Sequence, residues 1–90
     1  MEYTTIEVAG RVQGVAFRLY TQEMARRLNI SGTVQNLPDG RVRIKAAGKS
    51  NAIHQFIEWC REGSPASSVD EIHIEFVEPI SLPFPFQIIR

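Results

Sequence analysis

The sequence contains 90 residues, of which 43% are hydrophobic and 22% charged, and its ten basic residues balance ten acidic ones. This length and composition are typical of one globular domain spanning residues 1–90. The zero net charge argues against a protein whose affinity comes from neutralising nucleic-acid phosphates. Cys60 is the only cysteine, which excludes an internal disulfide and a cysteine-based zinc site.

The sequence shows no sign of export or of membrane insertion. The segment from Met1 to Thr5 lacks the basic start and the apolar run of a signal peptide, and no stretch approaches the length of a membrane span. A single cysteine also suits a reducing compartment. We therefore expect a soluble cytoplasmic protein that acts as a monomer, with no nucleic-acid partner and no membrane partner.

The first third of the chain changes from the period of a strand to that of a helix. Residues 6–12 alternate apolar and polar side chains, as a half-buried strand does. Four apolar residues then share one helical face: Phe17, Met24, Ala25 and Leu28. Four polar residues are expected to face away from it: Arg18, Gln22, Arg26 and Asn29. The polar stretch 29–32 predicts the end of this helix.

A hairpin and a second helix are predicted in the middle of the chain. Residues 33–37 and 42–46 are typical of two strands, and Leu37-Pro38-Asp39-Gly40 holds turn residues in hairpin order. The second helix is expected to use Ser50 or Asn51 as its N-cap. Gly63, with a proline two residues later, indicates its end. The apolar face of this helix has four residues: Ile53, Phe56, Ile57 and Cys60.

The last third predicts one long strand and one short one. Residues 71–76 alternate in the strand period, and residues 86–89 follow two prolines as a short edge strand. The element order is therefore β-α-β-β-α-β plus a terminal strand. Both amphipathic helices must cover one face of the sheet. We predict an α+β fold, a ferredoxin-like sandwich with an antiparallel sheet, two helices on one face and a short C-terminal edge strand.

The junction between the first strand and the first helix carries the most chemical information. Its sequence is Gly10-Arg11-Val12-Gln13-Gly14-Val15-Ala16-Phe17-Arg18. A glycine before a helix allows a sharp turn, and the first N–H groups of the helix, which lack partners, favour an anion. The Arg18 guanidinium would add a fork that matches two phosphoryl oxygens. A plain turn with a solvated arginine is the alternative interpretation of the same residues. No Gly-Lys-Ser/Thr follows, which excludes a nucleotide-binding P-loop.

This run resembles the signature of the acylphosphatase family, Gly-x-Val-Gln-Gly-Val-x-Phe-Arg. The resemblance extends through Gly32-Thr33-Val34-Gln35-Asn36-Leu37-Pro38-Asp39-Gly40-Arg41-Val42, which is similar to the second block of that family. It implies a ferredoxin-like enzyme that hydrolyses a small-molecule acyl phosphate to a carboxylate and inorganic phosphate, with no metal and no cofactor. It further implies two catalytic residues, Arg18, which binds the phosphoryl group, and Asn36, which holds the attacking water. The backbone amides implied to bind phosphate with Arg18 belong to Gln13, Gly14, Val15, Ala16 and Phe17.

Some residues admit another interpretation or depart from the family pattern. Taken alone, Asn36 is typical of a residue that initiates the following turn. Thr33 stands where an aromatic residue is frequent, Arg43 where an acidic one is frequent, and Ser64 where proline is frequent. These departures involve neither Arg18 nor Asn36, so they leave the implied activity intact.

Two other functions compete with the enzyme. A nucleic-acid-binding ferredoxin-like module would need outward-facing aromatic residues on its central strands, and residues 6–8 and 42–44 offer none. A non-catalytic domain with the same loop, as in hydrogenase-maturation proteins, is disfavoured because Arg18 and Asn36 are both present and the chain is short. His54 and His73 are expected at the surface, Cys60 in the core, and the basic stripe Arg41, Arg43 and Lys45 in solvent.

Overall fold

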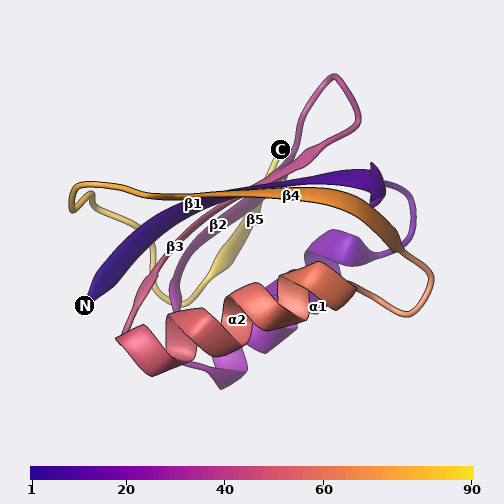
Figure 1. Ribbon diagram of the computed structural model, residues 1–90. Helices are drawn as coiled ribbons and strands as arrows, with labels where there is room; N and C mark the ends of the chain where they lie inside the picture. Colours follow the sequence, from indigo (N-terminus) through magenta and orange to yellow (C-terminus); the bar gives the residue numbers. More distant parts are fainter.

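The structure, a computed structural model that describes residues 1–90, places a five-stranded sheet above two helices (Figure 1). Both helices cover the same face of the sheet. No helix is long and apolar enough to span a bilayer. The elements in chain order are β1 (Glu2–Arg11), α1 (Phe17–Arg27), β2 (Ser31–Asn36), β3 (Val42–Gly48), α2 (Ser50–Glu62), β4 (Ser68–Phe76) and β5 (Gln87–Ile89).

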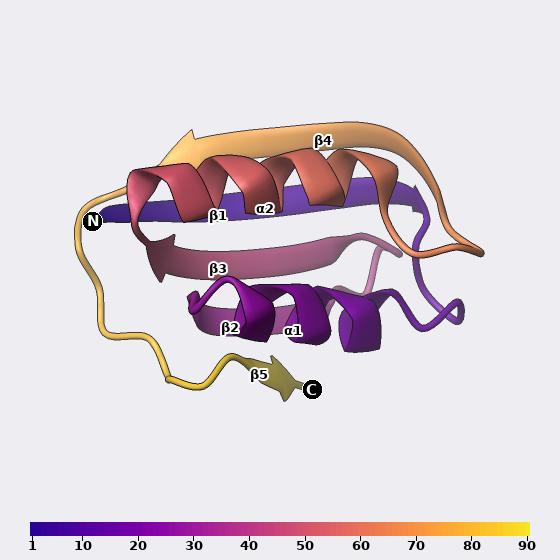
Figure 2. The same cartoon turned by 90° about the horizontal axis from the view of Figure 1, so that it is seen from below.

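The strands are arranged in the order β4-β1-β3-β2-β5. The β1 strand lies between β3 and β4 and is antiparallel to both, while β2 is antiparallel to β3. The predicted ferredoxin-like sandwich is therefore confirmed. The short strand β5 lies at the sheet edge as expected, and it runs parallel to β2, with Thr33 opposite Gln87. The complete sheet is consequently mixed, because the long segment before β5 returns the chain to the end where β2 begins (Figure 2).

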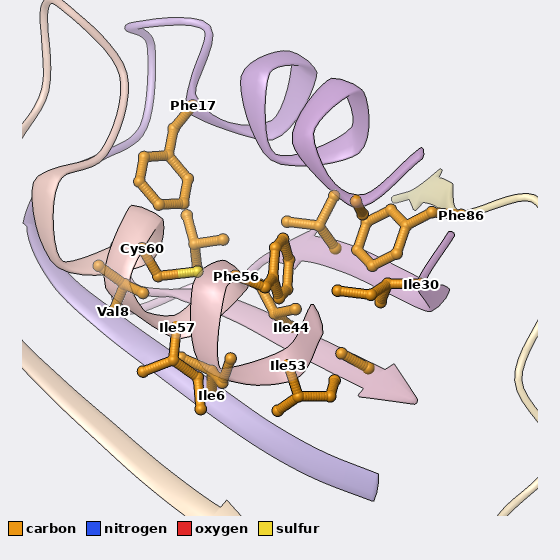
Figure 3. Packing of buried hydrophobic residues seen from close by; sticks show 14 of the residues in the cluster. Ile6, Val8, Phe17, Ile30, Ile44, Ile53, Phe56, Ile57, Cys60 and Phe86 are labelled. Atoms are coloured by element: carbon orange, nitrogen blue, oxygen red, sulfur yellow. The ribbon is translucent and has the colours of Figure 1, made fainter. Parts of the chain in front are cut away.

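The core lies between the sheet and the helices (Figure 3). All four residues predicted for the apolar face of α2 are buried. Their neighbours across the core include Ile6 and Val8 of β1 and Ile44 of β3, which are fully buried. An aromatic group extends the core along the helices: the Phe56 ring lies 6.0 Å from the Phe86 ring, and Phe17 lies 5.6 Å from Trp59, between ring centroids. Because Phe17 is the first residue of α1, this packing anchors the start of that helix.

The helix ends and polar faces differ from the sequence expectations in two places. The N-cap of α2 is Lys49, so the prediction of Ser50 or Asn51 was wrong. Lys49 makes no side-chain cap hydrogen bond, and the Ser50 hydroxyl donates to a Glu2 carboxylate oxygen at 3.3 Å. On α1, Arg26 does not simply face solvent, because its Nε and Nη2 donate to the Phe86 carbonyl at 3.1 and 2.9 Å. These bonds fasten the segment before β5 to the helix.

The predicted basic stripe on β3 and the preceding turn is only partly solvated. Arg43 donates to Glu7 on the neighbouring strand β1, with Nη2 and Oε2 separated by 3.0 Å. Arg41 lies within 3.6 to 3.9 Å of Glu7, Asp39 and Glu71 carboxylate oxygens. The arginines of this stripe are therefore paired with acidic residues across the open face of the sheet.

Three connections meet at one end of the molecule (Figure 2). They are the junction loop between β1 and α1 (residues 12–16), the hairpin turn between β2 and β3 (residues 37–41), and the α2–β4 loop (residues 63–67). The topology alone produces this meeting, since β1, β2 and α2 all run toward that end. Residues separated by about half the chain are thus brought side by side.

Candidate active site

The junction loop begins at a distortion of β1. The pairing of β1 with β4 shifts its register between Ala9 and Gly10, and Gly10 adopts a φ of 129°. A Cβ at this position would lie 2.2 Å from the Ser68 carbonyl oxygen, so no larger residue fits. Bulges of this kind bend a strand and redirect its end. The sequence signal at Gly10 thus corresponds to a physical requirement for glycine.

Two residues of the loop then adopt left-handed backbone conformations before the helix begins. Gly14 has a φ of 76°, and Ala16, the N-cap of α1, has a φ of 60° and a ψ of 22°. Left-handed backbone is ordinary for glycine but costs an L-residue such as alanine roughly 1–2 kcal/mol. Apart from Gly14 and its two chain neighbours, no residue has an atom within 4 Å of the position that a Gly14 Cβ would occupy. The loop backbone is therefore open to a ligand at this point.

The amides of this segment have no partner inside the protein. The backbone hydrogen bonds outside helices and strands include none donated by residues 13–16, and the first bond of α1 runs from the Tyr20 N–H to the Ala16 carbonyl at 3.2 Å. Ala16 offers no side-chain cap, and the first turn of α1 holds no acidic residue. Unpaired N–H groups at a helix N-terminus, aided by the helix dipole, form a site for an anion.

Arg18 supplies a cation to the same place. It lies in the first turn of α1, is half-buried, and forms none of the ion pairs found in the structure. An arginine at a helix N-terminus is opposed by the helix dipole, and no carboxylate offsets this arrangement. An anionic ligand would stabilise both the arginine and the free amides.

Asn36 faces this group from another element. It is the last residue of β2, opposite Val42 of β3. Its side-chain oxygen Oδ1 is buried and accepts no hydrogen bond. Leaving a buried acceptor unpaired costs about 1–3 kcal/mol.

A pocket of about 350 Å³ joins these groups. Its lining residues are Val12, Gly14, Ala16, Phe17, Arg18, Leu19, Asn36, Ile88 and Arg90. Five residues from the sequence prediction are thus brought together: Gly14, Ala16, Phe17, Arg18 and Asn36. The lining contains two arginines and no acidic side chain, so its electrostatic character favours an anion.

The two remaining predicted residues, Gln13 and Val15, do not line the pocket. The Val15 side chain packs against the core. The Gln13 side-chain amide Nε2 donates to two carbonyl oxygens of the hairpin turn, those of Leu37 and Arg41, each at 2.9 Å. Gln13 therefore ties the junction loop to the turn that follows Asn36.

Four lining residues were not anticipated from the sequence. Val12 is fully buried at the floor of the loop, while Ile88 and Arg90 come from the C-terminal segment, whose parallel pairing with β2 was not predicted. The sequence could have indicated Leu19 as a site residue, because it is an apolar residue on the polar side of a helix. In the structure 57% of its surface is exposed. An exposed leucine beside a charged pocket is consistent with a ligand that has an apolar part.

Other reactive residues lie away from this pocket. His54 and His73 are exposed as expected, and no three histidine, cysteine, aspartate or glutamate side chains are grouped closely enough to hold a metal ion. Cys60 is buried, and this burial raises the pKa of its thiol. A larger groove of about 680 Å³ runs between the helices, but Glu58 and Glu62 lie in its lining, which disfavours a phosphate there.

Comparisons with known proteins agree with the geometry. The sequence profile of the family Acylphosphatase matches residues 4–88. An acylphosphatase of Syntrophobacter fumaroxidans is 52% identical over 67 residues, which cover 74% of this chain and 69% of that protein. The crystal structure of acylphosphatase from Bacillus subtilis superposes with a TM-score of 0.95 at 39% identity, over the full length of both chains. Full-length HypF, solved in a phosphate- and nucleotide-bound form, gives a TM-score of 0.90 at 32% identity, with 99% of this chain covering 12% of HypF.

Proposed function

This chain belongs to the acylphosphatase family and is a hydrolase of acid anhydrides, and on that premise we propose how its own residues cleave an acyl phosphate. The substrate is a small-molecule acyl phosphate and the product is inorganic phosphate. The proposal assigns phosphoryl binding to Arg18 with the amides of residues 13–17, and water positioning to Asn36.

The chemistry of the substrate limits what the protein must supply. The leaving group is a carboxylate whose conjugate acid has a pKa of about 4, so it departs without being protonated and needs no general acid. What remains is to neutralise the phosphoryl oxygens and to place a water in line with the breaking bond. Phosphoryl transfer depends mainly on such positioning and electrostatic stabilisation.

Arg18 and the junction loop meet the first requirement. The guanidinium can donate to two phosphoryl oxygens at once, and the loop amides can donate to the others. Both sets of donors are already in place without an internal partner, so little reorganisation accompanies binding. The negative charge that develops on the phosphoryl group is thereby stabilised.

Asn36 meets the second requirement, and its place in the same pocket as Arg18 is the observation that carries the proposal. The side-chain amide of Asn36 can hold a water by a hydrogen bond in the pocket that also contains Arg18 and the free amides. That hydrogen bond would orient a lone pair of the water toward the phosphorus atom. An asparagine that only initiates the turn would not need to line the same pocket as an anion-binding arginine.

The reaction balances without a basic side chain. A new bond forms from the water oxygen to phosphorus while the bond from phosphorus to the carboxyl oxygen breaks. The water protons remain on the phosphate product, one of them accepted by a phosphoryl oxygen. No side chain that lines the pocket is a carboxylate or a histidine, so the substrate itself is the proton acceptor that we propose. We also propose that the protein acts as a cytoplasmic monomer and needs no metal.

Hydrolysis of benzoyl phosphate, followed by ultraviolet absorbance with a chelator present, tests the proposal. The aromatic acyl group suits the apolar lining of Leu19 and Ile88. We expect metal-independent turnover that Arg18→Ala reduces by about 100-fold or more, together with weaker inhibition by inorganic phosphate. Arg11→Ala is the matched control, because Arg11 is exposed at the end of β1 and does not line the pocket.

Two results would contradict the proposal. If folded wild-type protein does not hydrolyse benzoyl phosphate but binds phosphate, the chain is a binding domain that retains the loop. If Arg18→Ala is as active as Arg11→Ala, Arg18 is a surface arginine, and phosphoryl binding has been assigned to the wrong residues.

A further inference from the structure

Ser64 lies behind the junction loop and makes a hydrogen bond to it. The residue is only 3% exposed, and its hydroxyl donates to the Val15 carbonyl at 3.1 Å. Ser64 belongs to the α2–β4 loop, which reaches the same end of the molecule as the junction loop (Figure 2). Two segments 49 residues apart in sequence are therefore joined by one side chain.

Because the peptide group is planar, the hydrogen bond to the Val15 carbonyl also fixes the direction of the Ala16 N–H. The carbonyl of Val15 and the N–H of Ala16 belong to one peptide unit, and the only cis peptide of the chain is Phe84-Pro85. In a trans peptide these two groups point in opposite directions. Ser64 holds the carbonyl on the buried side, and Ala16 lines the pocket on the other. The Ala16 N–H is accordingly directed away from Ser64 and toward the pocket.

Ala16 needs such a constraint more than its neighbours do. Its left-handed φ of 60° is unfavourable for an alanine, so an unrestrained peptide would rotate toward a commoner conformation. Rotation of the peptide between Val15 and Ala16 would turn the N–H out of the pocket. The hydrogen bond from Ser64 opposes that rotation directly.

Ser64 is itself held firmly. The backbone N–H and the hydroxyl of Ser67 both donate to the Ser64 carbonyl, at 3.0 and 2.8 Å. Gly63, which precedes it, packs so closely that an added Cβ would lie 2.4 Å from the Ser67 hydroxyl oxygen and 3.1 Å from the Phe17 ring. The α2–β4 loop is thus a rigid support for the junction loop.

We propose that Ser64 is a positioning residue that fixes the peptide between Val15 and Ala16 so that the Ala16 N–H donates to the phosphoryl group. This inference rests on the proposed function and adds to it a residue outside the pocket. Ser64 touches no substrate in this account. It acts through the backbone of the loop, and its loss affects phosphate binding and turnover through that one donor.

The test compares Ser64→Ala with Ser67→Ala. Each variant loses one hydroxyl from the same loop, but only the first loses the bond to Val15. We expect Ser64→Ala to raise the inhibition constant of inorganic phosphate and to lower kcat/KM for benzoyl phosphate, by up to about a hundredfold. Ser67→Ala keeps the backbone hydrogen bond from the Ser67 N–H to the Ser64 carbonyl, so it is expected to lower thermal stability and to change both constants much less than Ser64→Ala does. Equal phosphate inhibition in wild type, Ser64→Ala and Ser67→Ala would overturn the proposal.

A second measurement uses only the wild-type protein, so it does not depend on the folding of a variant. Phosphate is titrated into labelled protein while the amide chemical shifts of the junction loop are followed by NMR. A large saturable shift of the Ala16 amide is the expected result. Shifts at Gly14 and Phe17 with none at Ala16 would overturn the role of Ser64 and leave the proposed function intact. If no loop amide responds and benzoyl phosphate is not hydrolysed, the proposed function fails as well.

Discussion

Arg18 and Asn36 illustrate how two ordinary residues acquire a role through what surrounds them. The arginine stands among free amides with no carboxylate nearby, and the asparagine holds a buried oxygen with no donor. Each arrangement is unfavourable when considered alone, and a bound phosphate would relieve that of Arg18 and the amides. Local destabilisation of this kind is expected where a protein is built to bind a ligand.

The role proposed for Asn36 predicts a particular kinetic effect. Asn36→Ala removes the side-chain amide that orients the water but leaves Arg18 and the backbone amides in place. We expect kcat to fall by about 100- to 1000-fold while the inhibition constant of phosphate changes little. Steady-state kinetics with benzoyl phosphate measure both quantities. Asn51→Ala, at an exposed site on α2, is the control. A variant that keeps wild-type turnover would show that Asn36 is a turn residue only.

At the scale of elements, the site depends on how the junction loop and the hairpin turn are joined. Gln13 makes this connection through two hydrogen bonds to the turn, and Asn36 lies immediately before that turn. The distance between the water-binding and phosphate-binding groups is therefore set partly by a side chain that does not line the pocket. The backbone amide of Gln13 belongs to the proposed phosphate-binding group, and its side chain helps to align Asn36.

Gln13→Ala is expected to affect stability and turnover together. Each lost hydrogen bond contributes about 0.5–1.5 kcal/mol, so the free energy of unfolding should fall by about 1–3 kcal/mol. Because Asn36 would then be less well aligned, kcat should fall more than phosphate affinity does. Urea unfolding and steady-state kinetics measure the two effects. Gln55→Ala is the control, since Gln55 is exposed on α2 and makes no side-chain hydrogen bond. Loss of stability with unchanged kcat would limit Gln13 to a structural role.

The positions of the helices and strands could be predicted from the sequence, whereas contacts between residues far apart in the chain could not. Periodicity located five of the seven elements, because apolar residues such as Ile53 and Phe56 recur at the helical period and those of β1 at the strand period. The hairpin turn indicated β2, and the preceding prolines indicated β5. The N-cap was missed because serine and asparagine are the preferred N-cap residues, whereas Lys49 holds that position without a side-chain hydrogen bond. Two features were missed because contacts between residues far apart in the sequence leave no local pattern. They are the place of Arg90 in the pocket and the hydrogen bond from Ser64 to Val15.

At the scale of the whole molecule, the loops of the site rest on one hydrophobic core. Fifteen buried residues form that core, and they include Val12 of the junction loop, Phe17 of α1 and Cys60 of α2. The residues beneath the pocket are therefore part of the same packing as the centre of the fold. We expect the site to lose its geometry when the core unfolds, and a probe of the core reports on both.

Cys60 provides such a probe through the pH dependence of stability. Burial raises the pKa of its thiol in the folded protein, whereas the thiol of the unfolded chain ionises near its ordinary value of about 8.5. The unfolded state therefore loses a proton that the folded state keeps. The corresponding stability is fully present below about pH 8.5, and it decreases as the pH rises further, by up to about 1.4 kcal/mol per pH unit.

Urea unfolding of wild type and Cys60→Ala over the alkaline range measures this term. The alanine variant starts from a lower stability, because removal of the buried sulfur leaves a cavity. Its free energy of unfolding should nevertheless fall less steeply with pH than that of the wild type, since only the wild type contains the thiol. All other ionisable side chains are the same in both proteins, so their contribution cancels from the difference between the slopes. Parallel slopes would mean that the thiol ionises in the folded state, and hence that the core beneath the pocket admits water.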